Sequence, residues 1–222
     1  MQDTIIEILE LVGESTLQTL IMVFFSTIFS CLLGFPIGVL LCVTEPETGL
    51  SPHPVLNQML SRIVNILRSF PFIILIILLF PLSRLIVGTS IGTAPTIVPL
   101  SIAAAPFVAR VIESSLKEVD SGIIQAARAM GSTTMQIIVK VLVPEALPSL
   151  VNGITLTIIN LIGYSAMAGA VGGGGLGDLA IRYGYQRFRT GIMIASVVVI
   201  ILMVELLQYL GNKISASIQK KR

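Results

Sequence analysis

The chain alternates between five mainly apolar stretches and the polar stretches that separate them. A helix crosses the hydrocarbon core of a bilayer in about 20 apolar residues, with a range of about 17–25. Each apolar stretch reaches this length. The pattern therefore predicts an all-α membrane protein with five transmembrane helices, at about 16–43, 63–83, 95–112, 148–170 and 190–210.

Prolines interrupt the second and third predicted spans. Only 15 residues between Arg68 and Arg84 are without charge, and Pro71 and Pro81 lie among them. Backbone carbonyls that a proline leaves unpaired must find partners in the protein or in a water-filled cavity. Such helices are common in transport pathways, and they also occur where helices simply pack together. Both interpretations stay open.

The longest polar stretch, 120–148, predicts two capped helices. For the first helix, Asp120 and Ser121 offer an N-cap, and apolar residues follow at helical spacing up to Met130. Gly131 supplies the left-handed residue that commonly ends a helix. We therefore expect the first helix to end at this glycine.

The second helix of this stretch is predicted directly afterwards. Thr133 and, three residues later, Gln136 form the pattern of a capping box, and Met135 opens the apolar face. Pro144 and Pro148 are expected to end this helix, because proline lacks an amide hydrogen. Two capped helices at an angle to one another are suited to sit in the groove of a partner protein.

The predicted fourth span combines polar side chains with a glycine-rich end. Polar groups within a span must face protein or water rather than lipid. The segment 169–177 then holds six glycines in nine residues, and no Lys-Ser or Lys-Thr follows it. We interpret this segment as a tight turn and not as a phosphate-binding loop. The polar residues of the span are Asn152, Thr155, Thr157, Asn160, Tyr164 and Ser165.

Composition agrees with a multi-pass membrane protein. Of the 222 residues, 54% are hydrophobic and only 12% are charged, whereas soluble domains carry about 25% charged residues. The net charge of +2, without a basic tract, gives no reason to expect nucleic acid as a partner. Both cysteines lie inside the first span, so we expect no disulfide framework.

The distribution of Lys and Arg predicts the orientation. Five spans put the termini on opposite sides, and cytoplasmic segments carry the excess of positive charge. With the N-terminus outside and the C-terminus inside, ten of these residues lie inside and four outside. The ten include the end of the basic tail, Lys220, Lys221 and Arg222. The stretch 120–148 is then cytoplasmic.

No residue set predicts catalysis by this chain. The single histidine, His53, lies in a loop, and no cluster of further metal ligands accompanies it. The pattern GxxxxGK[ST] is absent, so we do not expect the chain to bind ATP itself. Glu205 is the one acid within a span, which argues against ion-coupled transport. A partner docked on the cytoplasmic helix pair would supply the energy, and the axis of a symmetric dimer would hold the pathway.

The helix pair resembles the EAA loop of binding-protein-dependent ABC importer permeases. In that pattern Glu-Ala-Ala is followed by three residues, Gly, nine residues and Ile-x-Leu-Pro. The spacing agrees throughout, although Gln125 stands where the family has Glu, which removes one charge. Val141 and Val143 stand in place of Ile and Leu, which keeps these positions apolar. The positions that correspond to the pattern are Gln125, Ala126, Ala127, Gly131, Val141, Leu142, Val143 and Pro144.

The resemblance extends over most of the chain, and within the family the chain looks most like the methionine-uptake branch. It is carried by the segments RSFPFIIL (68–75), IVGTSIG (86–92), AAPFVAR (104–110), ARAMG (127–131), PEALP (144–148) and GYSAM (163–167). The resemblance implies one transmembrane domain over 1–222 in the bacterial cytoplasmic (inner) membrane. It also implies a homodimer held by two ABC ATPase subunits, and a substrate-binding lipoprotein outside the membrane. ATP and Mg would be bound by the ATPase, with no cofactor or metal in this chain.

Residue roles follow from the same resemblance. Coupling to the ATPase, through a coupling loop at 120–147, would involve Gln125, Ala126, Ala127, Gly131, Thr133, Met135, Gln136 and Pro144. Tyr164, Ser165 and Met167 would lie at the gate of the pathway, although Met167 could equally fill a helix interface. The expected function is methionine uptake by alternating access. The alternatives are the same machinery for another amino acid or short peptide, and a membrane carrier or scaffold that needs no ATPase.

Overall fold

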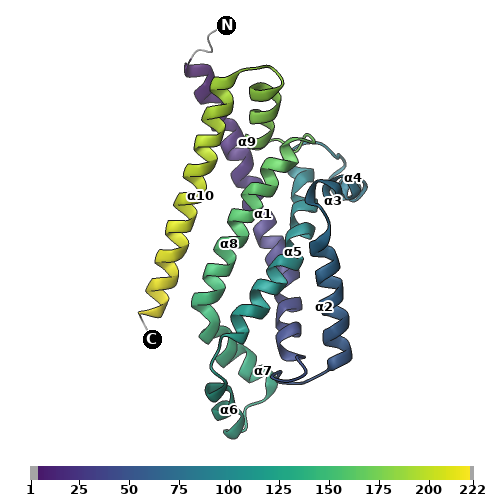
Figure 1. The fold of residues 1–222 in the computed structure, drawn as a ribbon, viewed down its shortest axis with the longest axis vertical. Coiled ribbons are helices and arrows are strands. Elements are labelled where there is room, and N and C mark those ends of the chain that lie inside the picture. Colours follow the sequence, from purple (N-terminus) through teal and green to yellow (C-terminus); the bar gives the residue numbers. More distant parts are fainter. Residues whose placement is uncertain (1–4, 221–222) are drawn as a thin grey trace. The chain divides into compact units, whose positions relative to one another are not determined.

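The computed structural model describes residues 5–220, and every regular element in that range is a helix (Figure 1). The all-helical class is therefore confirmed for the described residues. Single π-helical turns, η1 and η2, interrupt the α-helices twice. The elements are α1 (Ile5–Val43), α2 (Pro54–Ser69), α3 (Phe72–Leu78), α4 (Phe80–Val87), α5 (Thr93–Lys117), α6 (Ser121–Ala129), α7 (Thr134–Ile137), η1 (Ile138–Leu142), α8 (Val143–Gly169), α9 (Gly175–Asp178), η2 (Leu179–Tyr185) and α10 (Thr190–Gln219).

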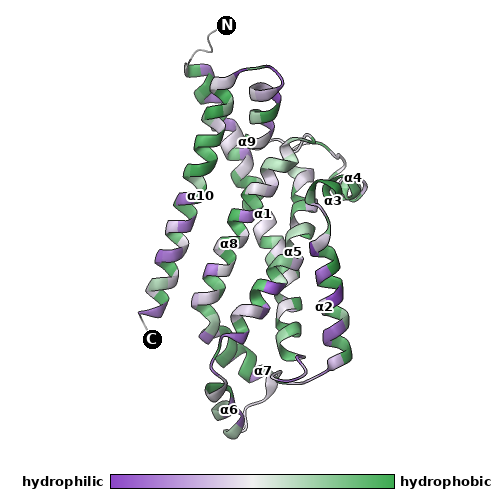
Figure 2. Cartoon of the chain, viewed as in Figure 1, coloured by the Kyte–Doolittle hydropathy of each residue, from purple (hydrophilic) through white to green (hydrophobic). Residues whose placement is uncertain are grey.

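Four continuous helical segments are long and apolar enough to cross a membrane. They are α1, α5, the run from α7 through α8, and α10. Hydrophobic residues cover most of α1 and the first half of α10 (Figure 2). A fifth span exists only if the broken pair of α2 and α3 is counted as one. The predicted number of spans thus depends on this pair.

The structure corrects the continuous helix expected at 63–83. The chain leaves the helical conformation at Phe70, and Pro71 is extended, with φ −60° and ψ 124°. A proline ring disfavours the helical conformation of the residue before it, which accounts for the break. Pro81 lies in the first turn of α4, where a missing amide hydrogen removes no helical hydrogen bond.

A second correction concerns Pro144 and Pro148, which do not end the helix that begins after Thr133. The helix continues through η1 into α8 and ends only at Gly169. In η1 the Val143 N–H donates to Ile138 O, five residues earlier. Such a widened turn moves the carbonyl with which a proline ring would clash, so the helix passes Pro144 without ending.

The described chain divides into two compact units. The first consists of Met1–Ser30, Phe70–Ala104 and Ile158–Gln208, and the second of Cys31–Ser69, Ala105–Thr157 and Tyr209–Arg222. In the first unit, Met22 of α1 packs with Leu100 of α5 and Leu161 of α8. In the second unit, Leu41 of α1 packs with Val64 of α2. Each unit therefore has its own apolar core.

Glycines permit the close approach of α1 to α5 in the second unit. A Cβ atom on Gly34 would lie 2.7 Å from Ala105 O, and one on Gly38 would lie 2.5 Å from Ala109 O. Real Cβ atoms do not come so close to a carbonyl oxygen, so only glycine fits at these two positions. The pair serves helix packing, as small residues do in other membrane helices.

The glycine-rich segment 169–177 is a tight turn within the first unit, as predicted. Gly172, Gly174 and Gly175 have φ values of 77–86°, which side chains rarely adopt. Two side chains of α1 hold the turn. Gln18 Oε1 accepts from Gly175 N and Thr19 Oγ1 accepts from Leu176 N, each at 2.9 Å.

Candidate functional site

The stretch 120–142 begins with a helix whose two ends are closed as predicted. Asp120 Oδ1 accepts from Gly122 N at 2.7 Å at the start of α6. At the other end, Gly131 N donates to Arg128 O at 2.9 Å and Ser132 N donates to Ala127 O at 3.1 Å. This pair of bonds is a Schellman motif, and it requires the φ of +78° that Gly131 adopts.

The capping box at the start of α7 is also present. Thr133 Oγ1 accepts from Gln136 N at 3.3 Å, and Gln136 Oε1 accepts from Thr133 N at 2.9 Å. These two bonds satisfy amide groups that the first turn of a helix leaves without a partner. Both predicted helix starts of this stretch are therefore confirmed.

The inner face of these helices packs on the rest of the second unit. Ala127, Ile137 and Leu142 are buried in one cluster with Ile112 and Leu116 of α5. Ala127 belongs to the residues for which a coupling role was expected, and its side chain is turned inward. It therefore supports the loop and is not free to contact a partner.

The outer face of the same helices exposes large apolar side chains among polar ones. Met130, Met135 and Val139 are 78%, 68% and 58% exposed. Gln125 and Ala126 are exposed as well. Large apolar side chains gathered on the surface of a loop are typical of protein interfaces, and Met adapts readily to a partner's shape.

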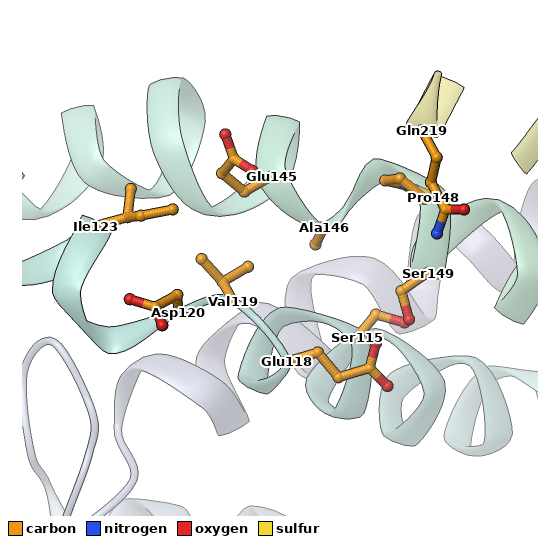
Figure 3. A pocket seen from close by; sticks show the side chains of 10 residues that line it. All are labelled: Ser115, Glu118, Val119, Asp120, Ile123, Glu145, Ala146, Pro148, Ser149 and Gln219. Carbon is orange, nitrogen blue, oxygen red and sulfur yellow. The ribbon is translucent and has the colours of Figure 1, made fainter. Parts of the chain in front are cut away.

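An acidic pocket of about 290 Å³ lies beside the start of α6 (Figure 3). Glu118, Asp120 and Glu145 bring three carboxyl groups to it, and Gln219 at the end of α10 reaches the same pocket. Asp120 already accepts the capping bond of α6. The pocket thus brings the last turn of α10 next to the beginning of the coupling loop.

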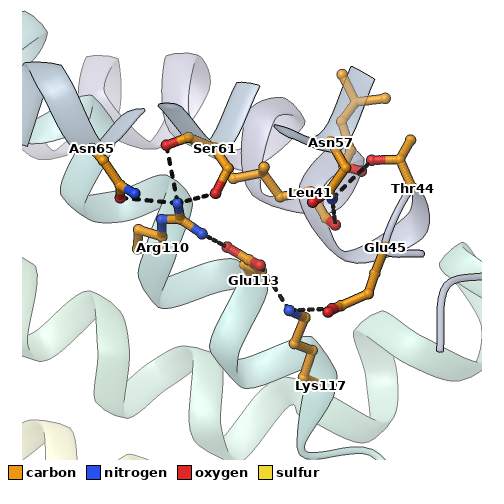
Figure 4. A network of polar contacts seen from close by, with 10 residues as sticks. Leu41, Thr44, Glu45, Asn57, Ser61, Asn65, Arg110, Glu113 and Lys117 are labelled. Carbon is orange, nitrogen blue, oxygen red and sulfur yellow. Dashed lines mark hydrogen bonds and ion pairs between the residues drawn. The ribbon is translucent and has the colours of Figure 1, made fainter. Parts of the chain in front are cut away.

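A polar network joins α5 to α2 within the second unit (Figure 4). Arg110 donates to Glu113 Oε2 at 2.7 Å, to Ser61 O at 3.1 Å and to Asn65 Oδ1 at 2.9 Å. The apolar side chains of α2, such as Met59 and Ile63, are exposed. Helix α2 thus directs Ser61 and Asn65 to Arg110, while Val64 packs on Leu41 and Met59 and Ile63 stay exposed.

The network continues from Glu113 to the connection between α1 and α2. Lys117 donates to Glu113 Oε1 at 2.8 Å and also forms an ion pair with Glu45 (Figure 4). Glu113 is buried, and both of its oxygens are paired with cations. Nearby, Asn57 donates to Leu41 O at 2.8 Å and so fixes the start of α2 to the end of α1.

Sequence reasoning missed this network. The helix was expected to end near residue 112, which left Glu113 and Lys117 in a loop. The signal was present, since Arg110, Glu113 and Lys117 follow one another at spacings of three and four residues, which is one face of a helix. Their partners on α2, Ser61 and Asn65, could not be identified from the neighbouring sequence.

The three candidate gate residues of α8 lie in different environments. Tyr164 stacks on Phe72, with ring centroids 4.4 Å apart. Ser165 is buried and donates to Ile162 O at 2.7 Å, inside its own helix. Met167 is 51% exposed. Of the three, Met167 is the most exposed, whereas Tyr164 is partly buried and Ser165 is buried.

Met167 shares its exposed face of α8 with two other residues. Asn160 and Gly163 precede it by seven and four residues, which places all three along one side of the helix, and all three are exposed. An amide, a bare backbone and a flexible thioether there can contact both water and an apolar solute. This face is the candidate pathway surface.

Comparison with known proteins gives consistent matches. Residues 34–220 match the family described as the binding-protein-dependent transport system inner membrane component. A probable D-methionine transport system permease protein, MetI, of Vibrio cholerae is 51% identical over 203 residues, which are 91% of this chain and 90% of that protein. MetI of Escherichia coli, a D-methionine transport system permease protein, is 54% identical over 152 residues, 68% of this chain and 70% of that one.

A solved structure is similar over nearly the full length. A chain of the MetNI methionine ABC transporter, in an inward-facing conformation, has a TM-score of 0.92 and 48% identity, and the match covers 94% of this chain and 96% of that chain. The helical fold, the apolar spans and the family match over 34–220 agree with one another. This chain belongs to the family of binding-protein-dependent transport system inner membrane components. It is a multi-pass protein of the inner membrane.

Proposed function

We propose that the chain is the permease subunit of an ATP-driven importer for methionine, and that it works as a homodimer with two ABC ATPase subunits. The names of its relatives and the similarity to a chain of MetNI support this proposal. ATP and Mg are bound by the ATPase, and this chain supplies the pathway. A substrate-binding lipoprotein delivers methionine from outside.

The exposed apolar face of the coupling loop carries the proposal. Three large apolar side chains, Met130, Met135 and Val139, are held outward by helices whose ends are closed and whose inner face is packed. A surface fixed in this way loses little conformational entropy on binding. Gln125 and Ala126 lie on the same loop and complete the surface offered to the ATPase.

The proposed orientation has the N-terminus outside and the C-terminus inside. It rests on the ten Lys and Arg residues that would then lie inside, against four outside. Two of the ten, Lys221 and Arg222, lie outside the described residues. In this orientation the coupling loop faces the cytoplasm, where the ATPase must be.

Transport then follows alternating access. Closure of the two ATPase subunits on ATP moves the helix that begins at Thr133, and hydrolysis reverses the motion. The face of α8 with Asn160, Gly163 and Met167 lines the pathway, and Met167 narrows it. Tyr164 and Ser165 act behind this face, because one stacks on Phe72 and the other is bonded within α8.

The test is uptake into liposomes that contain the chain, its ATPase and its binding protein. Labelled methionine should accumulate only when ATP is on the same side of the liposome membrane as the ATPase. Unlabelled methionine should reduce this uptake more strongly than leucine or a dipeptide does. Better competition by another amino acid would change the substrate. Accumulation without the ATPase would instead establish a carrier of a different class.

A further inference from the structure

The connection between α1 and α2, residues 44–53, is a rigid turn. Its backbone is held by hydrogen bonds from Gly49 N to Glu45 O at 3.2 Å, from Ser51 N to Val43 O at 3.0 Å, and from His53 N to Thr44 O at 3.0 Å. Gly49 is buried, and a Cβ atom there would lie 2.5 Å from both Val43 O and Glu45 O. The observed conformation of the turn therefore requires glycine at this position.

This turn is attached to the coupling loop. Arg128 of α6 donates from Nη2 to Gly49 O at 3.2 Å. Leu50 packs against the apolar cluster that holds Ala127 and Ile137. A pocket of about 270 Å³ is lined from one side by Thr48 and Leu50 and from the other by Ser121 and Ile124 of α6. The turn and the coupling loop thus form one continuous body (Figure 1).

The base of the turn is fixed to α5 as well. Glu45 forms an ion pair with Lys117, which also binds Glu113 (Figure 4). Two attachments, one to α5 and one to α6, leave the turn little freedom to move independently of the coupling loop. A displacement of α6 must therefore carry the turn with it.

The tip of the turn is free of such contacts. Pro46, Glu47 and Thr48 are exposed, and within residues 5–220 the Glu47 carboxylate has no hydrogen bond or ion pair. On the neighbouring face of α6, Gln125 is neutral, and Arg128 is engaged with Gly49 O. Glu47 is thus an exposed acidic group on the turn that Arg128 attaches to α6.

The geometry points to a second arm of the docking surface: the tip 46–48 contacts the ATPase subunit beside the coupling helices, with Glu47 opposite a cationic side chain of that subunit. This inference rests on the proposed function, in which the coupling loop binds the ATPase. Apolar anchors surrounded by charged residues are the usual composition of a protein interface. The rigid turn, continuous with the proposed interface, lets the charge set register and association rate without ordering a flexible loop.

The experiment measures affinity between the full-length permease in lipid nanodiscs and the P-loop ATPase that co-purifies with it. Glu47→Lys should weaken binding by about tenfold at low salt, and Glu47→Gln by about twofold to fivefold, because a like charge opposes the partner whereas a neutral side chain only loses attraction. Added salt should shrink both effects. Glu10→Lys makes the same charge change on an exposed residue of α1, which lies on the other side of the membrane in the proposed orientation, and should stay within about twofold of wild type.

Photo-cross-linking tests contact directly. A photoreactive amino acid at position 47 should capture the ATPase, and one at position 10 of α1 should not. Unchanged affinity of Glu47→Lys, or cross-links from position 47 to lipid alone, would overturn the second arm. Met135→Glu separates this outcome from failure of the proposed function: if that variant also binds normally, the coupling loop itself does not dock.

Discussion

Replacing Gly131 with valine is the sharpest test of the coupling loop. Gly131 has a φ of +78°, and nothing lies within 4 Å of the position a Cβ atom would take. A Cβ atom there would meet no steric obstacle, so we assign the cost to the backbone. Left-handed backbone costs an L-residue about 1–2 kcal/mol, and a β-branched residue lies at the upper end of a range of about 1–3 kcal/mol.

The expected effect follows from that energy. A cost of about 1–2 kcal/mol lowers the ratio of correctly closed to open α6 by a factor of about 5–30. Asparagine tolerates the left-handed conformation better than alanine, and alanine better than valine. We therefore expect the loss of coupling to increase from Gly131→Asn through Gly131→Ala to Gly131→Val. All three variants should remain in the membrane.

The assay is methionine transported per ATP hydrolysed, in liposomes with the ATPase and binding protein. Gly13→Ala is the matched control, because Gly13 lies inside helix α1 and also has open space around its Cβ position. Normal ATP-driven uptake by Gly131→Val would refute the reasoning. Equal losses for all three variants would show that something other than backbone strain is responsible.

Three further changes test other parts of the structure. Thr133→Ala should destabilise helix α7 by about 0.5–2 kcal/mol, because the capping bond is lost. Hydrogen exchange should then show faster opening of the first turn of α7, whereas Thr133→Ser should behave as wild type. Glu113→Gln should lower the folding stability in detergent by about 1–3 kcal/mol, because two cations lose their partner. The double variant with Lys117→Met should recover part of this loss. Strictly additive losses of stability for the two single variants would count against the network. Met167→Ala should change the rate of uptake, while the affinity for the ATPase stays within about twofold of wild type. Equal changes in the uptake rate and in the affinity for the ATPase would contradict a pathway role.

The sequence predicted those features of the coupling loop that depend on neighbours in the chain. Asp120, Gly131 and the pair of Thr133 and Gln136 each make their bonds within five residues, so their patterns were sufficient. The end expected at Pro144 was wrong, because one widened turn moves a carbonyl aside and allows the helix to continue. A proline pattern contains no information on that adjustment.

Contacts between distant segments could not be predicted in the same way. Arg110 is 45 residues from Asn65 in sequence, and Arg128 is 79 residues from Gly49. For the pathway, the family resemblance of the segment 163–167 grouped Tyr164 and Ser165 with Met167. Which of them is exposed is decided by Phe72 and by the packing of α8, so only the structure separates them. The roles of all three remain predictions.

The polar contacts between α2 and Arg110 have a consequence for how the chain is made. Ser61 and Asn65 leave the ribosome before Arg110, which they contact across 49 and 45 residues. At a synthesis rate of about 5–20 residues per second, their partner arrives about 2–10 seconds later. During that interval the polar side of α2 has no charge to meet, and its exit from the insertion machinery into lipid would leave polar groups in hydrocarbon. We therefore expect stable insertion of α2 to wait for α5, so that the two helices enter the membrane as a pair.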